Sequence, residues 1–332
     1  MALQESRRIA IEVEDQAEDS LLLKGFTLTE EVGRPFVCEV ELYSENQELD
    51  FDAIIGRRAS IRLEQGDDNT RYINGFIARF QQGGGQGPES VHRYGATIVP
   101  WLWFLTRSAD CRIFQDMTIP DILTMVFGDF GFSESVDDKT TGTYEVREYV
   151  VQYRETAFNF VSRLMEQEGI YYYFIHDDGH HKMVLADAPS AHEPAPGCEE
   201  LACRRDGEAD KRGVSEWTVE KRVVPGKHVV TDFDFKVPDK VLLSEKEGER
   251  SHAASGYEVF DYPGQFVEKA ESETQAATRI EELGLCHEIV TARTDARGLS
   301  VGCKFKLVGL SLIHISEPTR LRRISYAVFC LK

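Results

Sequence analysis

The sequence has 332 residues, of which 38 are basic and 57 acidic, and its formal net charge at neutral pH is −19. A chain of this length suffices for two or three domains of roughly 100–200 residues and can bury a sizeable core without disulfide bonds. The negative charge repels nucleic-acid phosphates and anionic lipids, so we expect no nucleic-acid partner.

We expect no Sec signal peptide at the N-terminus. Residues 1–19 are charged throughout and lack the apolar core of a signal peptide. No segment approaches the roughly 18–20 uninterrupted apolar residues of a membrane span. We therefore expect cytoplasmic folding and assembly, no membrane span, and export only through a machine that carries folded cargo.

The seven cysteines are odd in number and scattered along the chain. Only Cys198 and Cys203 lie close together, as C-x4-C, and no second pair completes the four ligands of a structural zinc site. We expect free thiols and no bound metal.

Short β-rich runs separated by turn residues fill the first hundred residues. Residues 36–43 alternate apolar with polar side chains, as a half-buried strand does. Similar runs begin near Ile9, Ala59, Tyr72 and His92. This spacing argues for a closed barrel or a sandwich.

A glycine-rich segment at 83–87 interrupts these runs. It could cradle phosphate only if a helix N-terminus followed, whereas Pro88 and another strand follow. We expect a hairpin tip.

The periodicity changes to that of a helix after residue 106. Thr118, Pro120 and Asp121 supply an N-cap, a first-turn proline and an acid at the third helical position. The apolar residues that follow recur on one helical face: Ile119, Ile122, Leu123, Val126, Phe127 and Phe130.

A second helix is expected to begin at Thr156 and to end at Gly169. The run at 170–175 then reads Ile-Tyr-Tyr-Tyr-Phe-Ile, and six large side chains of this kind predict a buried or interface strand. Two helices and such a strand predict an α/β module at 106–190.

The remaining chain is expected to return to strands. Residues 189–205, rich in Pro, Ala and Glu, read as an exposed connector. Strands are predicted at 217–220, 229–236 and 298–307, with a helix of mixed polarity near 268–283.

The aromatic run supplies the main candidate interface residues, namely Tyr171, Tyr172, Tyr173 and Phe174. Alternate side chains of a strand point to opposite faces, so one set could pack inside and the other against a neighbouring subunit, where Tyr is enriched. The alternative, that the module's own helices cover both faces, stays open. Two arginines, Arg154 and Arg163, could hold carboxylates within or between chains.

The densest titratable cluster contains His176, His180 and His181 with two aspartates. A metal-dependent hydrolase could use such a cluster, but its place between two strand-like runs favours a polar hairpin turn. No nucleophile elbow, zinc-protease motif or phosphate-binding loop is present. We expect no catalytic residues and no cofactor. A carbohydrate-binding module using exposed Trp101 and Trp103 is a further alternative.

Two long blocks carry a family resemblance. The first reads Cys-Arg-Ile-Phe-Gln-Asp at 111–116 and closes with Phe-Gly-Phe at 130–132. The second reads Tyr-Val-Val-Gln-Tyr-Arg-Glu-Thr at 149–156 and runs on to Phe174. With Phe-Asp-Tyr-Pro-Gly at 260–264, they resemble VgrG proteins, the spikes of type VI secretion systems, and the related phage late control protein D.

The resemblance covers roughly residues 5–309 and implies a mainly β, α+β fold like that of a phage baseplate hub. Two tail-tube-like β-barrels are expected, with an inserted α/β module. The first barrel would begin with residues 1–105, the module would span 106–190, and the rest of the first barrel and the second barrel would lie in 191–309.

The resemblance also implies a structural hub rather than an enzyme. Three chains would form a pseudo-hexameric ring that caps the Hcp tube hexamer, bind baseplate and effector proteins, and leave the cell through the type VI apparatus. A PAAR tip protein would join only if the family's needle were present. A phage or prophage tail baseplate hub is the alternative.

Residues 310–332 differ in composition from the rest of the chain, with four basic residues and one acid. The string resembles translated sequencing-adapter read-through, so we expect a non-native tail. A natural terminal strand at 324–331 is the alternative.

Overall fold

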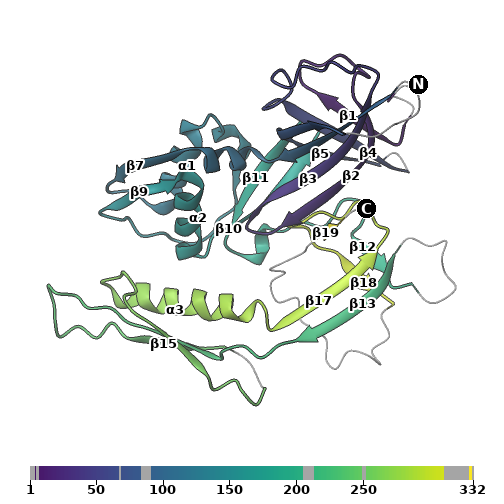
Figure 1. Ribbon diagram of the computed structural model, residues 1–332. Coiled ribbons are helices and arrows are strands. Elements are labelled where there is room, and N and C mark those ends of the chain that lie inside the picture. Colours follow the sequence, from purple (N-terminus) through teal and green to yellow (C-terminus); the bar gives the residue numbers. More distant parts are fainter. Residues whose placement is uncertain are drawn as a thin grey trace. The chain divides into compact units, whose positions relative to one another are not determined.

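The computed structural model describes residues 4, 7–66, 69–83, 91–204, 213–248, 252–309 and 329–330 (Figure 1). The chain divides into two compact units. Unit 1 comprises Met1–Glu166, Ile170–Leu201 and Ala296–Lys332, and unit 2 comprises Gln167–Gly169 and Ala202–Asp295. The glycine-rich tip beyond Gly83 and most of the 310–332 tail lie outside the described residues.

Unit 1 is built from a large sheet and a smaller α/β region. The strands of the large sheet are β1 (Ile9–Val13), β2 (Leu22–Glu31), β3 (Arg34–Ser44), β4 (Arg58–Gly66), β5 (Asn69–Gln82), β6 (His92–Val99) and β19 (Phe329–Cys330). The next segment contains η2 (Trp101–Arg107), β7 (Ala109–Phe114), α1 (Ile119–Asp129), η3 (Ser133–Ser135), β8 (Val136–Asp138), β9 (Val150–Thr156), α2 (Ala157–Glu168), β10 (Tyr171–Asp177), β11 (His180–Ala186) and η4 (Pro189–Ala191).

Unit 2 is a smaller assembly of paired strands and one helix. Its elements are β13 (Val214–Lys221), β14 (Lys227–Val230), β15 (Ser244–Glu247), β16 (Glu258–Asp261), α3 (Lys269–Gly284) and β17 (Glu288–Thr294). β12 (Glu200–Ala202) reaches the boundary between the units and pairs with β18 (Lys306–Val308) of unit 1. The fold is therefore mainly β, as the sequence predicted. No described helix is long and apolar enough to cross a membrane.

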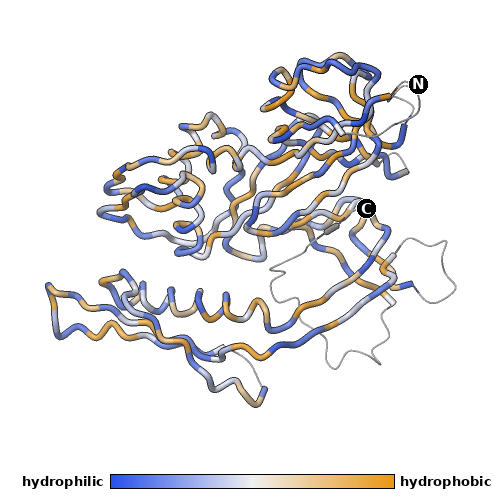
Figure 2. The backbone as a smooth tube through the Cα atoms, viewed as in Figure 1, coloured by the Kyte–Doolittle hydropathy of each residue, from blue (hydrophilic) through white to orange (hydrophobic). Residues whose placement is uncertain are grey.

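The large sheet has the strand order β1-β4-β5-β6-β3-β2-β19, with antiparallel neighbours. Its strands alternate between buried and exposed residues, and the backbone tube alternates in hydropathy along them (Figure 2). In β3 the inward residues are Phe36, Cys38, Val40 and Leu42. The predicted period-2 pattern is confirmed here.

Gln4 links the chain around β1 to the start of β2. Its side-chain amide donates to the carbonyl oxygens of Ile11 and Leu21 at 3.0 Å each, and accepts from the Ile11 N–H at 2.8 Å. The buried amide thus satisfies backbone groups that no ladder partner reaches, which ties these two parts of the curled sheet together.

The two helices of the α/β region begin where the sequence predicted, and α2 also ends where it predicted. Thr118 and Asp121 form a reciprocal capping box at the start of α1. The Thr156 hydroxyl accepts the Asn159 N–H at 3.1 Å at the start of α2, and Gly169 follows its end with φ +72°. The apolar stripe of α1 is buried except for Phe130, which is partly exposed at the C-cap.

Three predicted elements in the second half differ from the structure. The strand predicted at 229–236 ends at Val230, because the Asp232 and Asp234 carboxylates accept the backbone N–H groups of Phe233 and Lys236 and turn the chain. The strand predicted at 298–307 is reduced to β18, since turns at 298 and 301–302 and irregular backbone between and after them occupy the rest of the segment.

The third difference is the connector at 189–205, which was predicted to be exposed. Its small residues Ala191, Ala195 and Cys198 are buried. The Ala195 N–H donates to the Lys304 carbonyl and the Lys304 N–H to the Glu193 carbonyl, each at 2.8 Å. We call residues 296–308 the returning chain, because they lead back from unit 2 to unit 1. Pairing with the returning chain brings the segment at 189–201 into unit 1.

Gly302 allows that returning chain to pack against the aromatic strand β10. Its φ is +81°, and a Cβ placed on it would lie 2.2 Å from Cδ2 of Tyr173. Both the backbone conformation and the contact therefore require glycine.

We predict that Gly302→Ala lowers the free energy of unfolding by about 2–4 kcal/mol, since it adds overpacking to the left-handed strain. Gly33→Ala is the matched control, because Gly33 has φ +76° but open space around it. Urea denaturation measures both variants. Equal losses in the two variants would contradict the packing role of Tyr173.

Candidate functional site

A buried ion pair lies between two strands of the large sheet. Arg71 of β5 donates from Nη2 to Oε2 of Glu30 on β2 at 2.8 Å, and the side chains are only 7% and 4% exposed. Arg71 also donates from Nη1 to the Arg297 carbonyl at 3.0 Å. One guanidinium therefore joins two strands of the sheet to the returning chain.

His176 of β10 completes this buried network. Its Nδ1 accepts the Asn74 N–H at 3.0 Å, so the ring hydrogen of the neutral form is on Nε2. Nε2 faces Oε1 of Glu30 at 3.7 Å. Burial opposes ionisation of Glu30, but the His176 ring and the positive charge of Arg71 hold its pKa below the ordinary value. The carboxylate is therefore kept charged inside the fold.

The sequence analysis did not identify Glu30 and Arg71. The alternation of the strands could have indicated that both residues are buried. Glu30 lies two residues after buried Leu28, and Arg71 lies two residues before buried Ile73. Alternation therefore places both charges on inward-facing positions, where an unpaired charge would be costly.

His181 of β11 is buried among aromatic rings. Its Nε2 accepts the Trp101 N–H at 3.1 Å. Edges of Phe36, Phe76 and Phe174 pack around it, with ring centroids within 6.2 Å. Burial lowers the pKa of His181 well below its ordinary value. The ring is therefore a neutral acceptor for a backbone group that has no strand partner.

The predicted polar hairpin turn is confirmed only at its tip. Asp178 and Gly179 connect β10 to β11 and His180 is exposed, whereas His176 and His181 face each other across the ladder as buried residues. In each buried ring one nitrogen already accepts a backbone N–H. Across the described ranges, no group of three or more His, Cys, Asp or Glu could hold a metal ion.

The carbohydrate-binding alternative depended on exposed tryptophans. Trp101 is only 1% exposed and stacks on Phe132 at 4.9 Å. Trp103 is half-buried under the Arg107 guanidinium, 4.3 Å from the ring centroid. The expectation of an exposed Trp101 was wrong, because this residue fills the core between η2 and α1.

Both faces of the aromatic strand β10 are covered within unit 1. Tyr172 and Phe174 belong to the main core on one face. Tyr173 packs on the other face with Val301 and Ala191, and its hydroxyl donates to the Ala191 carbonyl at 2.8 Å. Tyr171 is partly buried, and its hydroxyl donates to the Ala188 carbonyl at 3.0 Å. The returning chain and the segment at 189–205, which was predicted to be an exposed connector, cover the face of β10 that the helices leave open.

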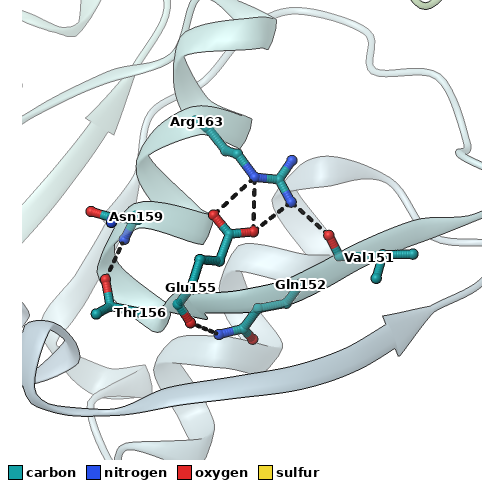
Figure 3. A network of polar contacts seen from close by, with 6 residues as sticks. All are labelled: Val151, Gln152, Glu155, Thr156, Asn159 and Arg163. Atoms are coloured by element: carbon teal, nitrogen blue, oxygen red, sulfur yellow. Dashed lines mark hydrogen bonds and ion pairs between the residues drawn. The ribbon is translucent and has the colours of Figure 1, made fainter.

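Arg163 binds a carboxylate of its own chain (Figure 3). Its Nε and Nη2 donate to the Glu155 carboxylate at 3.0 and 2.8 Å, and Nη2 also donates to the Val151 carbonyl at 2.6 Å. The bidentate geometry fixes the middle of α2 against β9.

Arg154 is exposed at a bulge in the β7–β9 ribbon. Asp110 pairs with Glu155 and Cys111 with Tyr153, so Arg154 is the extra residue and adopts φ +51°. Its guanidinium lies 5.3 Å from the Tyr153 ring centroid. Both arginines are exposed: Arg163 binds a carboxylate of its own chain, and Arg154 lies on an aromatic ring.

We predict that Arg71→Leu lowers the free energy of unfolding by about 3–5 kcal/mol, because it leaves the Glu30 carboxylate buried without its cation. The double variant Glu30→Leu/Arg71→Leu should recover most of that loss. Arg79→Ala, which breaks an exposed ion pair with Glu39, should cost less than about 1 kcal/mol. Additive losses in the double variant, measured by chemical denaturation, would show that the two charges are not coupled.

We predict that stability falls as pH drops below about 6.5, the pKa of an unfolded histidine. The unfolded chain binds a proton at His181 that the folded ring resists, so protonation favours unfolding. His181→Gln should reduce the pH slope of unfolding free energy by up to about 1.4 kcal/mol per pH unit.

The matched control is exposed His180→Gln, which should retain the wild-type slope. Denaturation midpoints between pH 7.5 and 5 give the comparison. A second loss, below the ordinary pKa of a glutamate, is expected from Glu30, whose lowered pKa makes protonation destabilising. Identical slopes in His181→Gln and wild type would exclude the proposed role of the buried ring.

Comparisons with known proteins place the chain in a family. A family model described as phage tail baseplate hub (GPD) matches residues 29–322. The type VI secretion system spike protein VgrG1b of Pseudomonas aeruginosa is 42% identical over 311 residues, which are 93% of this chain and 42% of that protein. VgrG1c of the same organism is 42% identical over 88% of this chain and 39% of its own length.

Solved structures show the same fold. An E. coli component of the type VI secretion system, described as structurally similar to the T4 bacteriophage tail proteins gp27 and gp5, aligns with a TM-score of 0.65 at 17% identity. The alignment covers 90% of this chain and 67% of that one.

The fold class is thus that of phage tail hub proteins. The chain belongs to the phage tail baseplate hub family, and it spans about two fifths of the length of the spike proteins it matches.

Proposed function

We propose that this chain is the structural hub of a type VI secretion spike. The observation that carries the proposal is the 42% identity to a type VI spike protein across 93% of the chain. In this role, three copies cap the Hcp tube and carry effectors during puncture of a target cell.

The architecture expected from the resemblance belongs to the same proposal. The seven-stranded sheet of unit 1 would correspond to the first tail-tube-like barrel, residues 106–190 to the inserted α/β module, and unit 2 to part of the second barrel. Two barrels in each of three chains give the sixfold surface that a hexameric tube requires.

The hub acts as a scaffold and not as a catalyst. The buried histidines His176 and His181 use a lone pair each on a backbone N–H, which supports a structural role for them. Baseplate and effector proteins are the further partners, with a PAAR protein wherever a needle extends the hub. Assembly occurs in the cytoplasm, and the type VI apparatus exports the folded spike.

Among the residues predicted for the interface, Arg154 is exposed and packs on a neighbouring aromatic ring of its own strand. It projects from the β7–β9 ribbon beside Tyr153, which is 65% exposed. Arg and Tyr are enriched in protein interfaces. Their cation–π contact stabilises the guanidinium when a partner protein removes water from it. We place a baseplate or effector contact on this ribbon.

A phage or prophage tail baseplate hub is the second candidate, because the matching family is described by its phage tail members. Both candidates share the scaffold role. They differ in the tube on which the hub sits.

We predict that the purified chain, mixed with Hcp from the same gene cluster, forms a complex of three chains on one hexamer, seen by electron cryomicroscopy. Arg154→Glu is expected to leave this complex intact, since the ribbon contact is with other proteins. Binding to a phage tail tube but not to Hcp would select the second candidate. Failure to bind either tube would contradict the hub proposal.

A further inference from the structure

A pocket lies in unit 1 where the β1 edge of the large sheet meets the β10–β11 hairpin. Its volume is about 300 Å³, at the lower end of the range of small-ligand sites. One wall comes from β1, β4 and β5, and the rest from Trp101, Phe132, Ser135 and the hairpin. The charged residues of this pocket take no part in the buried network around Glu30.

Two cross-strand rows on one face of the sheet form the first wall of the pocket. In each row, a residue in β1 or directly after it lies beside its partner on β4, which lies beside its partner on β5. Successive rows are two residues apart along each strand, so their side chains point to the same side. The register therefore brings six side chains to one surface. The rows are Glu12–Ser60–Asn74 and Glu14–Arg58–Phe76.

The three charged side chains of these rows have no ion-pair partner among the described residues. Glu12, Glu14 and Arg58 are all exposed. The Arg58 guanidinium lies 5.8 Å from the Phe76 ring centroid, and the Glu14 carboxylate accepts the Arg58 backbone N–H at 3.3 Å. The preceding residue Arg57, by contrast, binds the Asp15 carboxylate at 2.7 Å. Two carboxylates and one guanidinium in the pocket are thus available to a ligand.

Buried Asn74 fixes the shape of the pocket. Its Nδ2 donates to the carbonyls of Asp177 and His180, at 2.6 and 2.9 Å, and its Oδ1 accepts the Ser60 hydroxyl at 2.6 Å. Asn74 is only 3% exposed, so these hydrogen bonds are shielded from water. They hold the β10–β11 hairpin over β4 and β5. A ligand therefore meets a preformed site, which reduces the entropy cost of binding.

A second wall of the pocket is aromatic and contains an unsatisfied donor. The ring centroids of Phe76 and Phe132 are 6.0 Å apart, and Trp101 stacks on Phe132 at 4.9 Å. The indole N–H of Trp101 is buried and has no acceptor within the part of the chain that the structure describes. A buried indole N–H ordinarily has a partner, so this donor indicates an acceptor that the chain itself does not supply.

These groups fit an α-amino acid with a basic side chain. Its carboxylate matches the Arg58 guanidinium, which binds carboxylates through two parallel hydrogen bonds. Its side-chain cation matches Glu12 and Glu14, and its methylene groups can pack on Phe76. One positive and two negative side chains give the pocket a charge of −1, which a ligand of charge +1 balances. The chain's net charge of −19 also attracts a cation.

We propose that this pocket binds a basic α-amino acid, with the ligand carboxylate on Arg58 and the side-chain cation on Glu12 and Glu14. Glu12 and Arg58 are diagonal neighbours across β1 and β4, with Cβ atoms roughly 7 Å apart. A long side chain such as that of arginine therefore spans the two charges. The inference goes beyond the proposed hub function and does not depend on it.

Calorimetric titration of the whole chain with three ligands tests the proposal. L-Arginine carries both charges, agmatine lacks the carboxylate, and L-citrulline lacks the side-chain cation. L-Arginine should bind, and each analogue should bind at least about tenfold more weakly, because each loses one charge-assisted contact.

Two variants assign the contacts. Arg58→Gln should bind L-arginine no better than agmatine, and Glu12→Gln/Glu14→Gln should bind L-arginine no better than L-citrulline. Because these positions are exposed, the circular dichroism spectrum should stay unchanged. Arg57→Gln is the matched control, since Arg57 is next in the chain, does not line the pocket and should leave the affinity at the wild-type value.

Three results would each overturn the proposal. They are no binding of L-arginine up to about 10 mM, equal affinity for all three ligands, and an affinity for L-arginine that survives both Arg58→Gln and Glu12→Gln/Glu14→Gln. Binding of Hcp, which tests the hub function, is a separate measurement, so failure of one proposal is distinguished from failure of the other.

Discussion

The carboxylate of Glu30 is a negative charge buried in the core of unit 1, away from water. Arg71 neutralises it, Asn74 orients His176 against it, and the same arginine binds the carbonyl of Arg297. Residues from β2, β5, β10 and the returning chain must therefore reach their positions together. A carboxylate left without these partners would cost several kcal/mol, so partly assembled arrangements are disfavoured.

This network also explains how β10 is covered. Once Arg71 holds the chain at Arg297, the turn that follows brings Val301 and Gly302 onto Tyr173. The former connector packs on the same side and pairs with Lys304. The aromatic strand can then bury both of its faces inside one chain. The exposed side chains of the α/β region include Arg154 and Tyr153 on the β7–β9 ribbon.

Sequence reasoning succeeded where structure is determined by neighbours along the chain. The capping box at Thr118, the glycine after α2 and the alternation in β3 each depend on a few adjacent residues. It failed where a side chain competes for the backbone or where a distant contact decides. The run at 229–236 is rich in strand residues, yet Asp232 and Asp234 accept nearby backbone N–H groups and end the strand. Strand alternation places Glu30 on an inward-facing position, but periodicity does not reveal its partner Arg71, 41 positions away, nor the contact of Gly302 with Tyr173, 129 positions away.

The two units differ in the size of their hydrophobic cores. Unit 1 has a continuous core from the large sheet to α1 and α2, whereas unit 2 has a cluster of four buried residues under α3. Among the described residues of unit 2, twelve large apolar side chains are exposed.

Hydrogen–deuterium exchange of wild type and Arg71→Leu tests this account most directly. We expect the variant to lose protection together at amides of β2, β5 and β10, because the buried charges join these three strands. Loss of protection confined to β5 would contradict the account, because the three strands would then not depend on one network.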